Sequence, residues 1–364
     1  MRLHLVALPH TQTTSEYLSC AYTQKAVKFC RMMAPHHEVI LYAGEQNEAP
    51  CAEHVPLVTE AQRRGWFGEG FDTVRTPLRW EPYVPYFQVA NERAIREIRK
   101  RAEPRDLILL TTGWPQKPIA DAFPEHLSVE WAVGYEGICL PHRAFESAAW
   151  MHHVYGLRGI RNGHFYDAVI PNFFDPSEFH LADKEDYVLF VGRLVARKGP
   201  HVALQVAERA GVKLLVAGPG ATSWGKGEVI APEVTLQGDV EYVGELGVEE
   251  RASYMARARA LLCPTLYVEP FGGVAVEAML SGTPVIATDW GAFTETVTDL
   301  VGSRFRTLAE GAAAVRDWWE SGDPIDHEAI RQHAIRRYSL DAVRPRFERW
   351  LGQLQGLWGE GWNA

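Results

Sequence analysis

Short apolar runs alternate with amphipathic stretches over the first half of the chain. Apolar runs of this length are typical of strands buried on both faces of a sheet, and stretches with a helical spacing of apolar residues lie between them. Four strands are expected, at Leu3–Leu8, Glu38–Ala43, Asp106–Thr111 and Leu127–Val133, and helices at Tyr17–Met33 and Phe87–Arg101. This alternation favours a parallel sheet covered by helices.

A second alternation begins after a turn-rich segment near Pro171. Tyr187–Val191, Pro200–Ala210 and Val212–Ala217 form a compact strand–helix–strand unit, whose crossover is expected to be right-handed. Further strands are expected at Val240–Val243, Ala260–Cys263 and Pro284–Thr288, and helices at Val248–Ala258 and Gly272–Ser281. Three helical stretches close the chain, the last of them rich in tryptophan: Trp350, Trp358 and Trp362.

These patterns predict an α/β protein of two Rossmann-like, doubly wound domains that face a central cleft. The first domain is expected over residues 1–175 and the second over 180–340, with the helix at about 340–364 packing back on the first. In such folds ligands bind at the carboxyl ends of the parallel strands.

Composition limits the function classes. The 364 residues are 46% hydrophobic and 23% charged, the mix of a soluble globular protein of two ordinary domains. The net charge of −9 disfavours general binding to nucleic acid or to membrane surfaces. No run approaches the ~20 apolar residues of a membrane span. The five cysteines are scattered without a CxxC pair, which indicates free thiols, no zinc site and a cytoplasmic location.

Several common motifs fail on inspection. Gly220–Lys226 resembles a phosphate-binding P-loop, but Gly227 follows where Ser or Thr is needed, so a flexible loop is expected. Gly218-Pro219-Gly220 lacks the third glycine of a dinucleotide fingerprint, because Ser223 stands there. GxSxG, HExxH and Asp-x-Asp do not occur.

The stretch Glu269–Ala287 carries the clearest chemistry. Gly272 and Gly273 open a predicted helix after a strand, so their backbone N–H groups offer an anion site at the helix N-terminus. Glu269 and Glu277 flank that site. Because carboxylates repel phosphate, they are expected to bind hydroxyl groups instead. A ligand with both phosphates and hydroxyls is a nucleotide sugar.

A second feature lies in Phe190–Gly199, where Arg193 and Lys198 follow the end of a strand. Arginine offers a planar fork for phosphate oxygens, and lysine a compact charge. Together they would neutralise a leaving diphosphate without a metal ion.

These residues resemble the retaining glycosyltransferases of family 4, which have the GT-B fold. Glu269 and Glu277 match that family's Glu-x7-Glu motif, and Arg193 with Lys198 its phosphate-binding pair. Further matches are the "PN-x-x-D" turn at Pro171–Asp175, the loop beside the nucleotide base at Val240–Glu249, and the "GG-x-x-E" loop at Gly291–Glu295, with Ala292 as second glycine. The resemblance covers residues from about 170 to 300.

The resemblance implies transfer of a sugar, with retention, from a nucleotide-diphosphate sugar. The implied donor is a UDP-, GDP- or ADP-sugar, UDP-sugars being favoured, and no cofactor or metal is implied. Arg193, Lys198 and Glu269 would be catalytic, and Glu277 would hold the ribose diol. The implied donor-binding residues are Gly192, Arg193, Lys198, Tyr242, Val243, Glu269, Phe271, Gly272, Gly273, Val274 and Glu277.

The N-terminal half departs from the family's motifs. The first loop, Leu8–Glu16, lacks the usual glycine pair, and the acceptor-side candidates are His10, Thr11, Gln12, Tyr135 and Glu136. Glu130 stands where the family often has a histidine. Two interpretations stay open: Glu130 acts catalytically on the sugar or acceptor, or it pairs with a neighbouring arginine such as Arg143 to fix the loop.

Three alternatives to this assignment follow. An isomerase of the same fold, such as a nucleotide-sugar 2-epimerase, would need no acceptor. A glucosyltransferase acting on modified DNA bases would use the basic helix residues Arg93, Arg96, Arg99, Lys100, Arg101 and Arg105, which are interleaved with Glu92, Glu97 and Glu103. A non-catalytic nucleotide-sugar-binding protein is the third. The acceptor itself, whether a small molecule, a glycan or modified nucleic acid, is not specified by the sequence.

Overall fold

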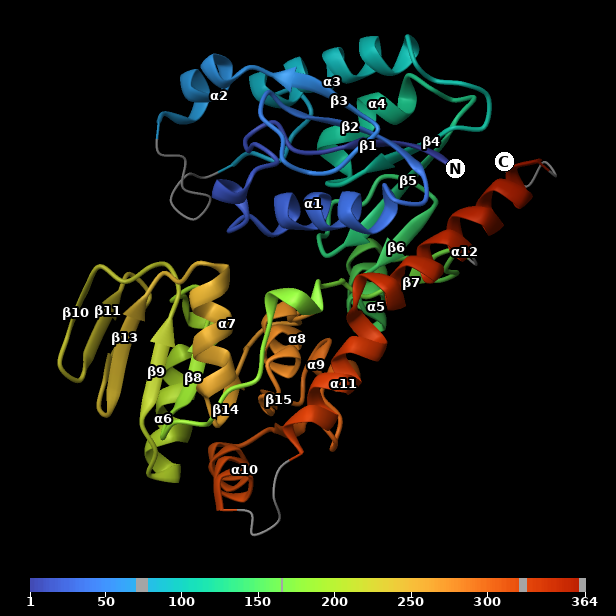
Figure 1. Cartoon of the computed structure of the whole chain (residues 1–364). Coiled ribbons are helices and arrows are strands. Elements are labelled where there is room, and N and C mark those ends of the chain that lie inside the picture. The colour runs from blue at the N-terminus through green and yellow to red at the C-terminus, as the bar shows by residue number, and fades with distance from the viewer. Residues whose placement is uncertain (70–77, 165, 321–325, 360–364) are drawn as a thin grey trace. The chain divides into compact units, whose positions relative to one another are not determined.

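The computed structural model describes residues 1–69, 78–164, 166–320 and 326–359. The chain divides into two compact units, drawn together in Figure 1. Unit 1 comprises residues 1–146, 154–173 and the segment from Leu340 onward, and unit 2 comprises residues 147–153 and 174–339. Trp362 lies outside the described residues.

Unit 1 is built on a seven-stranded sheet in the order β3-β2-β1-β4-β5-β6-β7, and every pairing is parallel. Its strands are β1 (Arg2–Val6), β2 (Glu38–Gly44), β3 (Glu53–Val58), β4 (Leu107–Leu110), β5 (Leu127–Val133), β6 (Arg143–Phe145) and β7 (Ala168–Val169). The all-apolar strand β4 is fully buried, as expected where helices cover both faces of a sheet. The four strands predicted in this half are confirmed.

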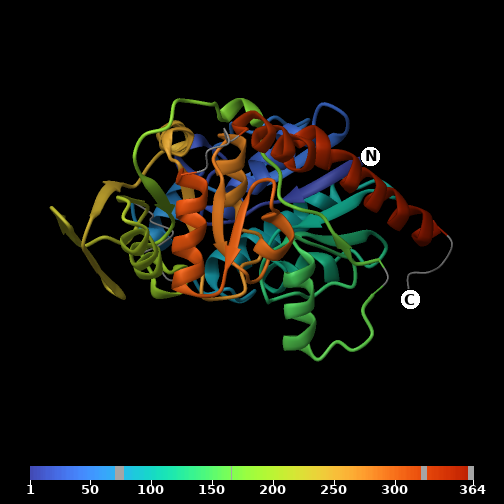
Figure 2. The ribbon, with the colours of Figure 1, turned by 90° about the horizontal axis from the view of Figure 1, so that it is seen from below.

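The helices of unit 1 follow its strands in the sequence. They are α1 (Ala21–Met33), α2 (Glu60–Phe67), α3 (Pro85–Arg99), α4 (Lys117–Asp121), α5 (Ala148–Arg158), which begins in unit 2, and α12 (Leu340–Gly359). The predicted helix from Tyr17 starts later, because Ser15–Tyr17 form a separate 3-10 turn, η1. Helix α12 packs against α1, and its red ribbon runs beside the blue N-terminal elements in Figure 2.

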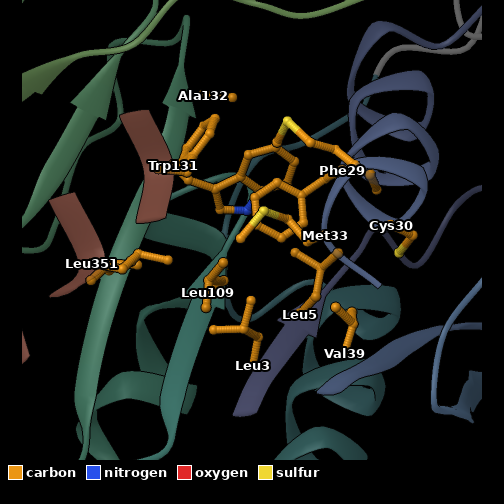
Figure 3. Close-up of a cluster of buried hydrophobic side chains, with 14 of the residues drawn as sticks. Leu3, Leu5, Phe29, Cys30, Met33, Val39, Leu109, Trp131, Ala132 and Leu351 are labelled. Atoms are coloured by element: carbon orange, nitrogen blue, oxygen red, sulfur yellow. The ribbon is translucent and has the colours of Figure 1, made fainter. Parts of the chain in front are cut away.

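The core of unit 1 joins residues from the N-terminal half of the chain with residues of its last helix. Leu5, Phe29, Trp131 and Leu351 meet in one fully buried cluster, shown in Figure 3. The rings of Phe29 and Trp131 lie 4.5 Å apart. The last helix is thus held in unit 1 by apolar contacts, the main favourable contribution to folding.

Unit 2 has a six-stranded parallel sheet in the order β13-β9-β8-β14-β15-β16. Its strands are β8 (Val188–Val191), β9 (Leu214–Ala217), β13 (Val240–Gly244), β14 (Ala260–Cys263), β15 (Val285–Thr288) and β16 (Gly302–Phe305). Its helices are α6 (Pro200–Ala210), α7 (Val248–Arg257), α8 (Gly273–Leu280), α9 (Phe293–Thr296), α10 (Leu308–Glu320) and α11 (His327–Tyr338), with short 3-10 turns η3 (Pro176–Glu178) and η4 (Ala196–Lys198). The predicted α/β class, with a parallel sheet in each half, is confirmed.

One segment of unit 2 differs from the prediction. Gly220–Lys226 was expected to be a flexible loop, but Ser223–Gly225 form strand β10 of a three-stranded antiparallel sheet with β11 (Glu228–Ala231) and β12 (Val234–Gln237). This small sheet lies at the edge of unit 2 in Figures 1 and 2. Strand β10 could not be predicted because all three of its residues are exposed and it lacks an apolar run.

All five cysteines are free, as predicted, and Cys20, Cys30 and Cys263 are buried. Within the described residues, no helix is both long enough and apolar enough to cross a membrane.

Candidate functional site

The candidate donor site of unit 2 lies at the carboxyl ends of β8, β9 and β14. Gly192 follows β8, and Gly218 follows β9 with φ of 127°. A Cβ on Gly218 would lie 2.2 Å from the carbonyl oxygen of Gly192. Only glycine permits this approach, so the two backbone turns meet directly at the sheet edge.

Lys198 and Glu269 meet at this edge from different loops. Lys198 ends η4, and its Nζ donates to Glu269 Oε2 at 2.7 Å. The Tyr267 hydroxyl donates to the same oxygen at 2.7 Å. Burial alone would lower the pKa of Lys198, but Glu269 and Tyr267 outweigh it and raise that pKa, so the ammonium stays charged. Burial and then Glu269 raise the pKa of Tyr267 to about 12, which keeps its hydroxyl a donor.

Arg193 sits in the same loop but differs from Lys198 in its surroundings. Its side chain is exposed, and it makes no hydrogen bond or ion pair with any residue that the structure describes. The neighbouring Arg197 instead lies over the Tyr267 ring, at 5.1 Å. Arg193 is therefore a guanidinium available for an added anion.

The N-terminus of α8 presents backbone rather than side chains. Gly272 precedes the helix with φ of 75°, and a Cβ there would lie 2.3 Å from Phe293 Cε1. The side chain of Phe271 is buried against Phe174 and Tyr338, so only its backbone is left for a ligand. Gly273 and Val274 form the first turn and are half-buried.

Glu277 lies one turn further along α8 and is buried. Arg251 of α7 donates to both of its carboxylate oxygens, from Nε at 2.8 Å and from Nη2 at 3.2 Å. A carboxylate has about four lone-pair sites, so two remain for other donors. Sequence reasoning missed Arg251, because nothing in the chain marks a pairing between two separate helices.

Tyr242 and Val243 belong to β13. The Tyr242 hydroxyl donates to the carbonyl oxygen of Gly218 at 2.8 Å, which fixes the ring above the end of β9. The exposed Trp224 of β10 lies edge-on to it, with ring centres 5.0 Å apart. Val243 is half-buried and packs against the apolar core.

A further set of contacts fixes the segment before α8. The Ser147 hydroxyl donates to the carbonyl oxygen of Pro270 at 2.7 Å. The carboxylate of Glu295 accepts from the backbone N–H groups of Ala148 and Ala149 at 3.0 and 2.7 Å, at the start of α5. The last residue of the predicted "GG-x-x-E" loop therefore caps a helix.

In unit 1, the acceptor-side candidates of the first loop are buried. Thr11 and Thr23 share a hydroxyl hydrogen bond of 2.6 Å, and Gln12 donates to Glu60 at 2.7 Å. Burial lowers the pKa of His10 to about 3, so its imidazole is neutral. These side chains are engaged by unit 1 itself.

Glu130 is fully buried in β5, and its carboxylate contacts the loop that follows the strand. Its carboxylate accepts from the backbone N–H groups of Cys139 and Leu140 at 3.0–3.2 Å, and from the Tyr135 hydroxyl at 3.2 Å. Burial raises the pKa of Glu130 to about 7, against these hydrogen bonds. Glu136 is exposed in the same loop.

Of the two interpretations of Glu130, the ion pair with Arg143 is not found, although Arg143 lies close enough for its charge to oppose the rise in the pKa of Glu130. Arg143 forms a two-point ion pair with Asp167, at 3.0 and 2.6 Å. The strand of Arg143, β6, lies between β5 and β7, and Glu130 is its register partner on β5, yet the guanidinium pairs with Asp167 just before β7. Glu130 fixes its loop through backbone N–H groups instead.

Three of the six candidate basic residues in α3 and just after it are paired with acidic neighbours. Arg96, Lys100 and Arg101 all contact Glu97, and Arg101 also contacts Glu53. This is the arrangement of a solvated helix face. Among the described residues, no three His, Cys, Asp or Glu side chains are grouped as a metal site requires.

Comparison with known proteins finds sequence similarity to glycosyltransferases in the second half of the chain. Residues 173–334 match the family model of glycosyl transferases group 1. A D-inositol 3-phosphate glycosyltransferase of Nocardia farcinica is 32% identical over 142 residues, 34% of this chain and 30% of that protein. An uncharacterized glycosyltransferase of Methanocaldococcus jannaschii is 32% identical over 173 residues, 45% and 44% of the two chains. The matches thus span less than half the length of these relatives.

Solved structures match over nearly the whole chain. AviGT4, a glycosyltransferase involved in avilamycin A biosynthesis, aligns with a TM-score of 0.67 and 21% identity over 98% of both chains. Anabaena HepE in complex with UDP-glucose aligns with a TM-score of 0.63 and 16% identity, over 97% of this chain and 100% of that one. Likeness at these identities shows the fold, which is GT-B as expected, and within it residues 173–334 match the model of the group 1 glycosyl transferases.

Proposed function

We propose that this protein is a retaining glycosyltransferase that takes its sugar from a nucleotide-diphosphate donor, with UDP-sugars favoured. The observation that carries the proposal is the charge arrangement at one sheet edge of unit 2. Arg193, a guanidinium without a partner among the described residues, and Lys198, a charged amine, share that edge with the backbone turn at Gly272. Cations and helix N–H groups together suit a diphosphate.

The proposed step breaks the bond between the sugar's anomeric carbon and the β-phosphate oxygen, which leaves with the electron pair. The acceptor hydroxyl oxygen bonds to the same carbon on the same face, and its proton passes to the leaving phosphate. Arg193 and Lys198 stabilise the negative charge that grows on the diphosphate, which is electrostatic catalysis. No divalent metal ion is needed in this scheme, because two cations of the chain supply the charge.

The carboxylates take the hydroxyl-binding roles. Lys198 donates to Glu269 and also interacts with Tyr267, and of its three donor hydrogens at least one remains for a phosphate oxygen. Glu269 accepts from sugar hydroxyls, and Glu277 uses its remaining lone pairs for the ribose diol. Tyr242 and Val243 lie beside the base.

Similarity supports this proposal at three points. The matched relatives include proteins named D-inositol 3-phosphate glycosyltransferase. HepE, which shares the fold, has been solved with UDP and with UDP-glucose. The Glu-x7-Glu spacing is that of retaining family 4 enzymes.

The test begins with the donor. Binding of UDP, GDP and ADP is measured by calorimetry, and release of nucleotide from UDP-glucose, UDP-galactose and UDP-N-acetylglucosamine is followed with a mixture of candidate acceptors. A transferred sugar whose anomeric configuration matches the donor, seen by proton NMR, supports the proposal. Conversion of the donor into an epimer without any acceptor would replace it with the isomerase alternative.

Metal dependence is tested in the same assay. Turnover is expected to persist after treatment with EDTA. Loss of all turnover, restored by Mn²⁺ or Mg²⁺, would contradict the metal-independent scheme.

A further inference from the structure

A second cavity of unit 2 opens at the same sheet edge as the candidate donor site, on the other side of β14. It has a volume of about 310 Å³ and lies among the segments that follow β14, β15 and β16. Its lining includes Leu266, Asp289, Trp290, Phe305 and Arg306. Ligand pockets span about 300 to 1,000 Å³, so this cavity suits a single ring rather than a large ligand.

The lining combines an aromatic surface with polar groups. The Trp290 side chain is 51% exposed and that of Leu266 55%, although both are large and apolar. Asp289 lies between two arginines, accepting from Arg304 Nε and Arg306 Nε at 3.0 Å each. An exposed indole beside a fixed carboxylate–guanidinium pair offers both an apolar face and a set of donors and acceptors.

The two charged residues that line the cavity, Asp289 and Arg306, have opposite signs and pair with each other, which indicates the kind of ligand. Both guanidinium groups are committed to Asp289, so neither is left unpaired for a phosphate or carboxylate. A purely apolar ligand would leave the carboxylate and guanidinium groups of the lining without hydrogen bonds to the ligand. A sugar ring fits both the aromatic surface and the polar groups of the lining. Its C–H face packs on an indole, and its hydroxyl groups form hydrogen bonds with carboxylate and guanidinium.

The cavity is joined to the candidate donor site by short backbone contacts. Gly291 follows Trp290, and a Cβ on it would lie 2.6 Å from the backbone nitrogen of Glu269. Ala292 donates its N–H to the carbonyl oxygen of Glu269 at 3.0 Å. On the other side, the N–H of Leu266 donates to the carbonyl oxygen of Arg197.

We infer that this cavity is a subsite for one sugar ring of the acceptor, so that the acceptor is a glycan with at least two residues near the site. This inference rests on the proposed function, since it places the subsite beside the transferred sugar. Trp290 forms the platform for the ring, and Asp289 and Arg306 bind its hydroxyl groups.

The experiment measures saccharide binding directly. Maltotriose, mannotriose, cellotriose and chitotriose are each titrated to about 10 mM and followed by saturation-transfer NMR, with and without UDP. At least one is expected to bind the wild type. Trp290→Ala should weaken that binding about 10-fold or more, and Trp290→Phe, which keeps a ring, by no more than about 3-fold.

Matched controls separate this inference from the proposed function. Leu300→Ala removes another exposed large apolar side chain of unit 2, away from both sites, and should leave saccharide binding unchanged. UDP should bind Trp290→Ala as it binds the wild type. The subsite is disproved if none of the four saccharides binds, or if Trp290→Ala binds as well as the wild type. Saccharide binding that depends on Trp290, without any binding of UDP, would instead contradict the proposed donor.

Discussion

Arg251 and Glu277 are joined by a two-point ion pair, 26 residues apart in the sequence and on different helices. Both side chains are largely shielded, with 19% and 9% of their surface exposed. The family motif assigns Glu277 to the ribose of the donor, yet in the structure it already holds α7 against α8. The pair therefore has a structural role that must be separated from the proposed binding role.

Variants of both residues make that separation. Glu277→Gln should raise the Kd for UDP about tenfold, because an amide accepts fewer hydroxyl donors, and should also lower Tm by leaving Arg251 unpaired. The double variant Arg251→Met/Glu277→Leu replaces the buried ion pair with apolar groups and should recover Tm. Calorimetry and thermal unfolding measure the two effects. If the double variant binds UDP as tightly as the wild type, Glu277 serves only to join the helices.

Arg193→Ala tests the proposed leaving-group cation. The exposed guanidinium has no partner among the described residues, so Tm should stay unchanged. The kcat should fall by an amount that corresponds to a loss of about 2–4 kcal/mol of transition-state stabilisation. The KM for the donor should change by less than about 3-fold, because the charge grows only as the bond breaks. Arg197→Ala removes the same charge from the same loop and serves as the control, with a much smaller expected loss. Equal losses in both variants would point to general electrostatic attraction instead.

The sequence was sufficient for the elements that depend on local pattern. The apolar run of residues 106–111 contains β4, and the glycine pair before α8 marks the helix start to within one residue. Patterns of this kind are strong because buried parallel strands are uniformly apolar. Strand β10 could not be found in this way, because its three exposed residues are stabilised by pairing with β11.

The candidate site divides along the same line. Lys198 and Glu269 lie on motifs that the sequence displays, and the structure brings their side chains together. Tyr267 was missed, although its place two residues before Glu269 in the same loop was a usable signal. The expected nearness of Glu130 and Arg143 is confirmed by the strand register, but the ion pair of Arg143 is with Asp167, and the sequence does not show which of two nearby carboxylates a guanidinium binds.

The buried carboxyl of Glu130 predicts a pH dependence of stability. Its folded pKa of about 7 lies above the ordinary value of 4.5, so between these pH values the unfolded chain loses a proton that the folded chain keeps. Stability therefore falls as pH rises through this window, by about 3 kcal/mol for this group, and levels off above it. Glu130→Gln, which cannot titrate, should lack this contribution.

The measurement is urea unfolding of the wild type and Glu130→Gln from pH 4.5 to 8.5. The difference in unfolding free energy between the two proteins should shift in favour of the variant as pH rises. Other titrating groups are common to both proteins and cancel in that difference. Parallel curves across the whole range would show that Glu130 has an ordinary pKa.

Gly291→Ala tests whether the loop after β15 positions Glu269. Gly291 has φ of 56°, in the left-handed region. A Cβ added to it would lie 2.6 Å from the backbone nitrogen of Glu269. Alanine at this position should lower the free energy of unfolding by about 1–2 kcal/mol from the backbone conformation alone. The clash must also displace either this loop or Glu269. Because Glu269 also binds Lys198, the kcat should fall more than the affinity for UDP.

Gly352→Ala is the matched control, since α12 offers open space at that position and a helical alanine is favoured over glycine. Thermal unfolding and donor kinetics of both variants provide the comparison. A Gly291→Ala protein with the Tm and kcat of the wild type would show that the two loops move independently.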